Sequence, residues 1–407
     1  MIAVRRTVLF IDFNSFFASV EQHANPLLRG KPVGVIPTMA ETTSCIAASK
    51  EAKRFGVKTG TGVREARQRC PGIVFVLSDS VKYMDYHRRL VSLCEEEVPV
   101  EKICSVDEMY AVFTGAYAEK QPMWEIASNL KRRLAKDFGG PLTCSIGLAP
   151  TVFLAKTASD MQKPDGLIWL DAQQPGPAFF ELELMDLCGI GRQMHERLKM
   201  RGIRTVRALW DAPCEKLHRV WGGIEGDRFW QALHGVEPVR PAVIPRQVGH
   251  SKILHPELRH ENGARAMLDR LVYKAALRLR KEGYECGEMV VWVKRSREFA
   301  GQSWSVMARF PSTQEVRPLL QVWRDLWQTR PRPLSHAFAV GVDLTRLLPQ
   351  GEPRLPLFAP CPRDQSISAM LDMIAKKHGS KALWYASAQQ AVAEDVPRIA
   401  FHTLPDV

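Results

Sequence analysis

The hydrophobic and polar positions of this chain predict a mixture of strands and helices. Residues 8–11 form an apolar run rich in β-branched residues, which is typical of a buried strand. The pattern that follows predicts a helix that begins with Ser15 as its cap and continues past Glu21. Two further apolar runs, at 98–103 and 109–113, are separated by a short polar break. We expect that break at a strand end or in a tight turn.

The second half of the chain has the most regular pattern. Its segments follow the order strand, helix, strand, strand, helix, strand, and they span 247–254, 261–281, 289–293, 303–310, 314–327 and 336–344. This βαββαβ order predicts a ferredoxin-like unit with both helices on one face of its sheet and the other face free for a ligand. Trp323 and Trp327 lie at helical spacing and are expected in the core. A short amphipathic helix is expected at 366–378.

Two shorter segments carry basic or glycine-rich patterns. Residues 47–54 predict a helix that bears Lys50 and Lys53. After a proline-rich stretch near residue 173, Gly189 and Gly191 lie in the sequence Asp-Leu-Cys-Gly-Ile-Gly, which has the shape of a helix-hairpin-helix. The glycine turn of such a motif lets backbone N–H groups approach a DNA phosphate. A simple turn is the alternative for Gly-Ile-Gly.

Composition limits the class of protein and points to a polyanionic partner. The chain has 407 residues, room for about two to four domains, and a formal net charge of +12. Between Arg240 and Arg332 there are 18 Lys and Arg against 9 Asp and Glu, so most of the surplus lies in one predicted domain. A basic surface can serve solubility alone, but this local surplus favours nucleic acid.

The cysteines and the hydropathy exclude several other classes. Nine scattered cysteines without a C-x-x-C pair fit neither a disulfide framework nor a zinc site. No apolar run reaches membrane-spanning length, and the N-terminus lacks the pattern of a signal peptide. We therefore expect a cytoplasmic protein without a membrane partner.

Three carboxylates carry the candidate chemistry. Asp12 follows the first predicted strand, and Asp107 and Glu108 occupy the polar break between the two later runs. Acidic groups at the ends of neighbouring strands can converge on two Mg²⁺ ions about 3.5–4 Å apart, which clamp the oxygens of a phosphoryl transfer. Oxygen ligands favour Mg²⁺, with Mn²⁺ as a substitute, over zinc. Taken alone, such residues are more often a helix cap and a solvated acidic pair than a metal site.

The sequence around the carboxylates contains three ordered motifs. Residues 12–21 match D-x-[DN]-x-F-[FY]-A-x-V-E, and residues 105–108 match S-[IV]-D-E. Residues 145–166, SIGLAPTVFLAKTASDMQKPDG, match a third motif with Leu148 as the only deviation. In these motifs and their spacing the chain resembles the Y-family (DinB/UmuC group) of translesion DNA polymerases. The third motif favours polymerase IV-like members, whereas Asn14 favours UmuC-like members.

The resemblance implies a metal site. It identifies Asp12, Asp107 and Glu108 as the catalytic, metal-binding carboxylates and the carbonyl of Phe13 as a further ligand. The implied cofactor is Mg²⁺, two ions per active site.

The resemblance also implies nucleotide-binding residues. Phe17 matches the steric gate that excludes a 2′-hydroxyl, and Lys156 matches a phosphate contact. Lys50 and Lys53 stand where the family often has a tyrosine and an arginine that touch the triphosphate. Each residue has a plain structural alternative, namely core packing for Phe17 and an exposed basic surface for the lysines.

The implied fold class is α+β and multidomain, with a ferredoxin-like palm, small fingers, a helix-hairpin-helix thumb and a βαββαβ little finger. The predicted divisions are palm 1–14 and 80–172, fingers 15–79, thumb 173–238, linker 239–245, little finger 246–346 and tail 347–407. In the tail, Leu355, Leu357 and Phe358 resemble the peptide by which bacterial polymerases dock on the sliding clamp, although Arg354 stands where glutamine is typical.

The predicted function is therefore template-directed, error-prone translesion DNA synthesis by a monomer that uses primer-template DNA and dNTPs. One alternative is a non-catalytic Y-family adaptor bound to the clamp, but such proteins typically lose the carboxylates. The other is a helix-hairpin-helix DNA-binding repair protein, which leaves the first 170 residues unexplained.

Overall fold

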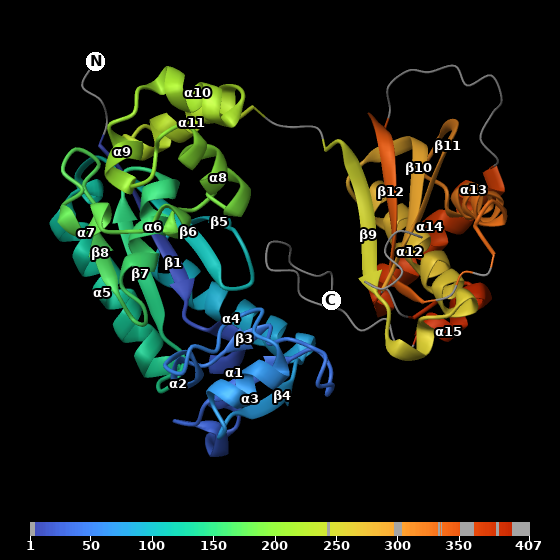
Figure 1. Ribbon diagram of the computed structural model, residues 1–407, viewed down its shortest axis with the longest axis horizontal. Helices are drawn as coiled ribbons and strands as arrows, with labels where there is room; N and C mark the ends of the chain where they lie inside the picture. The colour runs from blue at the N-terminus through green and yellow to red at the C-terminus, as the bar shows by residue number, and fades with distance from the viewer. Residues whose placement is uncertain are drawn as a thin grey trace. The chain divides into compact units, whose positions relative to one another are not determined.

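The computed structural model forms two compact units, drawn in Figure 1. One consists mainly of residues 1–240 and the other mainly of residues 241–397. The structure describes residues 5–241, 245–296, 303–332, 334, 336–350, 362–379 and 382–392. Within these ranges no helix is long and apolar enough to cross a membrane, and every cysteine is a free thiol.

A five-stranded sheet forms the centre of the first unit. Its strand order is β5-β6-β1-β7-β8. The strands are β1 (Arg6–Phe13), β5 (Val100–Ile103), β6 (Glu108–Thr114), β7 (Cys144–Ala149) and β8 (Leu167–Trp169). Leu9 and Ile11 pack into one core, whereas Val8 and Phe10 pack into another on the opposite face. Because both faces of β1 are buried, its sequence is a continuous apolar run and does not alternate between apolar and polar residues.

Helices cover both faces of this sheet. The core that contains Leu9 and Ile11 also receives α1 (Phe16–Ala24), α4 (Ser80–Glu97) and α5 (Lys120–Asp137). The opposite core receives α6 (Val152–Met161) and the helices of residues 177–233. The contact between α6 and β7 is unusually close at Gly147, where a Cβ atom would lie 1.9 Å from the carbonyl oxygen of Ala155. Only glycine allows this approach.

Two local predictions in the first unit are wrong. Ser15 does not cap α1 with its side chain, because its backbone is left-handed (φ 50°) and no side-chain capping bond forms. The predicted helix at 47–54 is shorter than expected. Ala47–Ala48 form strand β3, and α2 (Lys50–Lys53) begins only after Ser49, whose hydroxyl accepts the N–H of Ala52. Pairing with a neighbouring strand overrides the local helical preference there.

The remaining elements of the first unit are short. Residues 33–77 contain a small sheet in the order β3-β2-β4, with β2 (Val33–Ile36), β4 (Val74–Leu77) and α3 (Val63–Arg69). Residues 177–233 form a helical segment with α7 (Pro177–Phe180), η3 (Leu184–Asp186), α8 (Arg192–Met200), α9 (Val206–Trp210), α10 (Cys214–Trp221) and α11 (Ile224–Leu233). Two further 3₁₀ turns are η1 (Pro26–Leu28) and η2 (Gly115–Ala118).

The second unit confirms the predicted βαββαβ order. Its sheet has the order β11-β10-β12-β9, and its elements are β9 (Gln247–Ile253), η4 (Pro256–Leu258), α12 (Glu261–Lys281), β10 (Tyr284–Arg295), β11 (Trp304–Thr313), α13 (Val316–Gln328) and β12 (Ala337–Pro349). Trp323 and Trp327 are buried in its core as predicted, and the indole of Trp323 donates to Asp269 at 2.7 Å.

The tail adds helices to this second unit. They are α14 (Pro362–His378), which begins earlier than the predicted 366, then η6 (Ala386–Ala388) and α15 (Gln389–Val392). Ion pairs hold α14 to the unit, with Arg280 on Asp372 at 2.6 Å and Arg317 on Asp364 at 2.8 Å. The predicted clamp residues, Leu355, Leu357 and Phe358, lie outside the described residues.

Candidate active site

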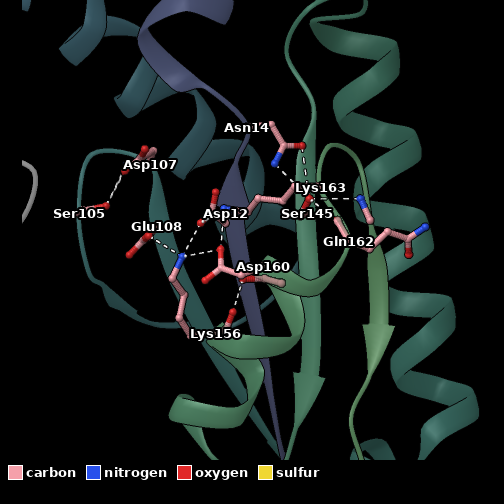
Figure 2. Close-up of polar contacts among 12 residues, drawn as sticks. Asp12, Asn14, Ser105, Asp107, Glu108, Ser145, Lys156, Asp160, Gln162 and Lys163 are labelled. Atoms are coloured by element: carbon pink, nitrogen blue, oxygen red, sulfur yellow. Dashed lines mark hydrogen bonds and ion pairs between the residues drawn. The ribbon is translucent and has the colours of Figure 1, made fainter. Parts of the chain in front are cut away.

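Strand pairing brings two of the three predicted carboxylates together. β1 and β6 are antiparallel, and their register sets Asp12 directly opposite Glu108. Asp12 is buried, and Glu108 is partly exposed. Side chains at directly opposed positions lie on the same face of a sheet. The two carboxylates therefore face the same space (Figure 2).

A lysine ammonium lies between these carboxylates. Lys156 Nζ is 2.5 Å from Asp12 Oδ2 and 2.7 Å from Glu108 Oε1. Lys156 belongs to α6, so the close packing at Gly147 is what carries its ammonium to β1. Burial acts to raise the pKa of Asp12, but the ammonium groups of Lys156 and Lys163 outweigh it and hold that pKa below its usual range. The same carboxylates raise the pKa of Lys156 against the effect of its burial.

Asp107 lies apart from this ion cluster, on the turn before β6. Its carboxylate accepts the hydroxyl of Ser105 at 2.7 Å, and its carbonyl accepts the N–H of Phe13 at 2.9 Å. Burial raises the pKa of Asp107 to about 6, and the charges of Asp12 and Glu108 add to the rise while the Ser105 hydroxyl opposes it. The ionised form of the Asp107 carboxylate would therefore be stabilised by a cation bound beside it.

The donor set fits a hard divalent cation. Among the described residues no group of three or more His, Cys, Asp or Glu is arranged to hold a metal directly. Asp12 and Glu108 instead both contact one ammonium, which shows that a cation is favoured between them. Mg²⁺ prefers oxygen ligands. The carboxylates of Asp12, Glu108 and Asp107 and the carbonyl of Phe13, the last residue of β1, are all of this kind.

The two lysines of α2 that were predicted to bind the nucleotide, Lys50 and Lys53, differ in their surroundings. Both are exposed on α2. Partial desolvation and the nearby Lys163 lower the pKa of Lys53, while Asp12 and Asp107 act in the opposite direction. Lys53 thus shares the electrostatic environment of the carboxylates. Lys50 acts on its neighbour Glu51, whose pKa it helps to lower.

Phe17 is buried and supported from behind by an aromatic residue that the sequence did not single out. Its ring stacks on Tyr83 of α4, with 4.5 Å between centroids and 23° between planes. The Tyr83 hydroxyl donates to Glu21 at 2.8 Å, and Lys82 contacts the other oxygen of that carboxylate at 2.8 Å. Tyr83 therefore supports the predicted steric gate, and the Glu21 carboxylate, paired with Lys82, holds the Tyr83 hydroxyl.

His87 supports the turn that carries Asp107. It is buried one helical turn after Tyr83 on α4, and its Nδ1 lies 2.8 Å from the carbonyl oxygen of Val106. Burial lowers the pKa of His87, although the bond to Val106 opposes that shift. The neutral ring therefore donates to the turn from within the core. In the sequence, only the four-residue spacing of Tyr83 and His87 indicated that they share one face of a helix, and nothing indicated what either contacts.

The glycines predicted to contact DNA lie at and just before the start of α8. Gly189 has φ +86°, a conformation that favours glycine, and Gly191 is the N-cap of α8. Neither would meet another atom within 4 Å if it carried a Cβ. Backbone N–H groups at such an open helix start can be approached by an anion.

Comparison with known proteins decides the family. The impB/mucB/samB family matches residues 11–160, and the C-terminal domain of that family matches residues 245–357. DNA polymerase IV of Pelotomaculum thermopropionicum is 31% identical over 388 residues, which cover 93% of this chain and 94% of that protein. The chain belongs to the Y-family of DNA polymerases.

Other Y-family members agree. DNA polymerase IV 1 of Bacillus subtilis is 29% identical over a matched region that covers 93% of this chain and 92% of that protein. A solved Y-family DNA polymerase chimera of Dbh and Dpo4 has a TM-score of 0.67 at 22% identity, with 84% of this chain and 100% of that chain covered. The predicted fold class and the predicted enzyme class, a DNA-directed DNA polymerase of translesion synthesis, are confirmed. Membership in the Y-family implies dependence on a divalent metal.

The buried His87 makes stability depend on pH. Because its pKa is lowered in the folded chain, the unfolded chain binds a proton more readily once the pH falls below about 6.5, and the free energy of unfolding falls with it. We expect His87→Gln to lose less stability than the wild type between about pH 7.5 and about pH 5.5. Urea unfolding at the two pH values measures this, and an equal loss in both proteins would contradict it.

Proposed function

We propose that this chain extends a DNA primer by two-metal nucleotidyl transfer at Asp12, Asp107 and Glu108. The observation that supports this best is the cation between the opposed carboxylates of Asp12 and Glu108. Those carboxylates, Asp107 and the Phe13 carbonyl would hold two Mg²⁺ ions, or Mn²⁺ in their place. When bound, such ions activate the primer 3′-hydroxyl and stabilise the leaving pyrophosphate.

The other residues of the site position the nucleotide. We assign the triphosphate to Lys156 from the palm and to Lys50 and Lys53 from the fingers, since ammonium groups bind phosphate as point charges. Phe17, whose ring stacks on Tyr83, would exclude a 2′-hydroxyl and so reject ribonucleotides.

The template and its partners occupy other parts of the chain. Gly189 and Gly191 would approach a DNA phosphate through backbone N–H groups, and the basic second unit would add phosphate contacts. Leu355, Leu357 and Phe358 would dock on a sliding clamp. We place this activity in the cytoplasm, in a monomer divided into palm, fingers, thumb and little finger near the predicted boundaries.

Removal of one carboxylate tests the metal site. We expect Asp107→Ala to lower the rate of nucleotide addition on the order of a thousandfold or more, because two-metal electrostatics contribute several kcal/mol to the barrier. Primer-template binding should persist, since DNA affinity comes from basic residues elsewhere. Single-turnover primer extension and a DNA-binding titration measure the two effects.

An exposed acidic residue provides the control for this variant. Glu125 lies on α5 and contacts Gln121 of the same helix, so Glu125→Ala should extend primers like the wild type. Extension by Asp107→Ala within about tenfold of the wild type would contradict the assignment, because loss of a metal ligand costs more than that.

The steric gate makes a claim about sugar selection. We expect Phe17→Ala to raise incorporation of ribonucleotides far more than it lowers incorporation of dNTPs, because the change removes a clash and no ligand. Phe16 is the matched control, since it is equally buried beside Phe17 on α1 with 5.6 Å between ring centroids. Kinetics with each nucleotide give the ratio.

Two results would count against the gate. The first is an unchanged ratio in Phe17→Ala, which would leave Phe17 as a core residue. The second is an equal loss of selectivity in Phe16→Ala, which would attribute the effect to a damaged core.

A further inference from the structure

The first turn of α6 receives a negative charge from a residue that is distant in the sequence. No acidic residue lies in that turn itself. Instead, Glu237 Oε2 accepts the N–H of Val152, the first residue of the helix, at 2.8 Å. The hydroxyl of Thr151 accepts the N–H of Leu154, so two donors that have no partner within the helix are satisfied. A carboxylate at this end of a helix also interacts favourably with the helix dipole.

An arginine at the start of β1 fixes the same carboxylate. Arg6 Nη1 lies 3.0 Å from Glu237 Oε2 and donates to the carbonyl of Pro150 at 2.7 Å. The two charged side chains are 30% and 32% exposed, so solvent screens their ion pair only in part. Because Pro150 lies between β7 and α6, Arg6 and Glu237 together hold the entry to the helix at the start of β1.

Two contacts with α11 fix the segment that leads to Glu237. The hydroxyl of Thr151 donates to the carbonyl of Ala232 near the end of α11, at 2.8 Å. The rings of Phe153 and Phe229 lie edge to face, with 5.0 Å between their centroids. The last residues of α11 are therefore bound to the first residues of α6. Glu237 follows a few residues later and is delivered to α6 by packed structure.

The position of α6 along β1 determines where the ammonium of Lys156 lies. The Val152 end of the helix is held beside Arg6, at the start of the strand. Lys156 lies one turn further on, and its Nζ is 5.4 Å from the ring centroid of Phe10 and 2.5 Å from Asp12, near the end of the strand (Figure 2). A displacement of about 1 Å is enough to misplace a group that binds substrate.

We propose that Glu237 is a positioning residue that sets Lys156 for binding the incoming nucleotide. It acts by holding the N–H of Val152 and, through Arg6, the start of β1. This inference rests on the proposed function, because it takes Lys156 to contact the triphosphate. It adds a residue that no motif of the sequence singled out. The simpler alternative is that Glu237 only stabilises the fold around the start of α6.

Glu237→Ala and Glu237→Gln test the proposal in direct binding. A dideoxy-terminated primer prevents chemistry, so the affinity of the enzyme–DNA complex for the correct dNTP can be titrated. We expect Glu237→Ala to weaken dNTP binding about threefold or more, the size of effect found for residues coupled through shared packing. Glu237→Gln should bind dNTP nearly like the wild type, because its amide oxygen can still accept the N–H of Val152.

A double variant separates positioning from a general loss of stability. If Glu237 acts through Lys156, Glu237→Ala should weaken dNTP binding by less than about twofold once Lys156 is replaced by alanine, since no ammonium is left to position. A general loss of structure would weaken binding by the same factor in both backgrounds. Thermal melting of each variant checks that it is folded at the temperature of the titration.

Glu225 offers a matched control near the start of α11. Its carboxylate pairs with Arg228 at 2.5 Å and with Arg240 at 3.1 Å, and it has no contact with α6 among the described interactions. Glu225→Ala should therefore bind dNTP like the wild type. The proposal is overturned if Glu225→Ala loses as much affinity as Glu237→Ala, if Glu237→Gln behaves like Glu237→Ala, or if the loss is equal in both Lys156 backgrounds.

The Lys156→Ala variant separates this test from the test of the proposed function. If Lys156→Ala binds dNTP like the wild type, the assignment of the triphosphate to Lys156 itself fails. If Lys156→Ala weakens dNTP binding while Glu237→Ala keeps full affinity, that assignment stands and only the role of Glu237 is refuted.

Discussion

The antiparallel pairing of β1 with β6 is the constraint on which the rest of the site depends. It sets Asp12 opposite Glu108, and two carboxylates so placed and partly desolvated repel each other unless a cation lies between them. Lys156 supplies that cation, and Gly147 lets α6 come close enough to deliver it. Strand register, helix packing and ion binding are therefore parts of a single arrangement.

The sequence predicted the elements whose patterns are dictated by burial. Residues 8–11 are continuous and apolar because cores cover both faces of β1. The strands of the second half were recognisable because β10 and β11 bury alternate residues over much of their length. The failures were local. Ser15 was predicted to cap a helix, but its backbone takes a left-handed conformation. Ala47–Ala48 were predicted to be helical, but they pair with β2 as a strand.

The contacts within the site were harder to predict than its members. The motifs named Asp12, Asp107, Glu108, Phe17 and Lys156, yet Tyr83 and His87 received no role. Both act on residues distant in sequence, Tyr83 on Phe17 and His87 on Val106. Such pairings depend on how α4 packs against β1 and its neighbours, which no periodicity within α4 specifies.

Helix α4 has a consequence for how this enzyme can change. One face of it carries Tyr83, which supports the residue proposed to select the sugar, and His87, which holds the turn of a carboxylate proposed to bind metal. A substitution that shifts this face moves both supports at once. If Phe17 and Asp107 have the proposed roles, sugar discrimination and turnover are mechanically coupled, and variants selected for a looser nucleotide pocket would become slower enzymes as well.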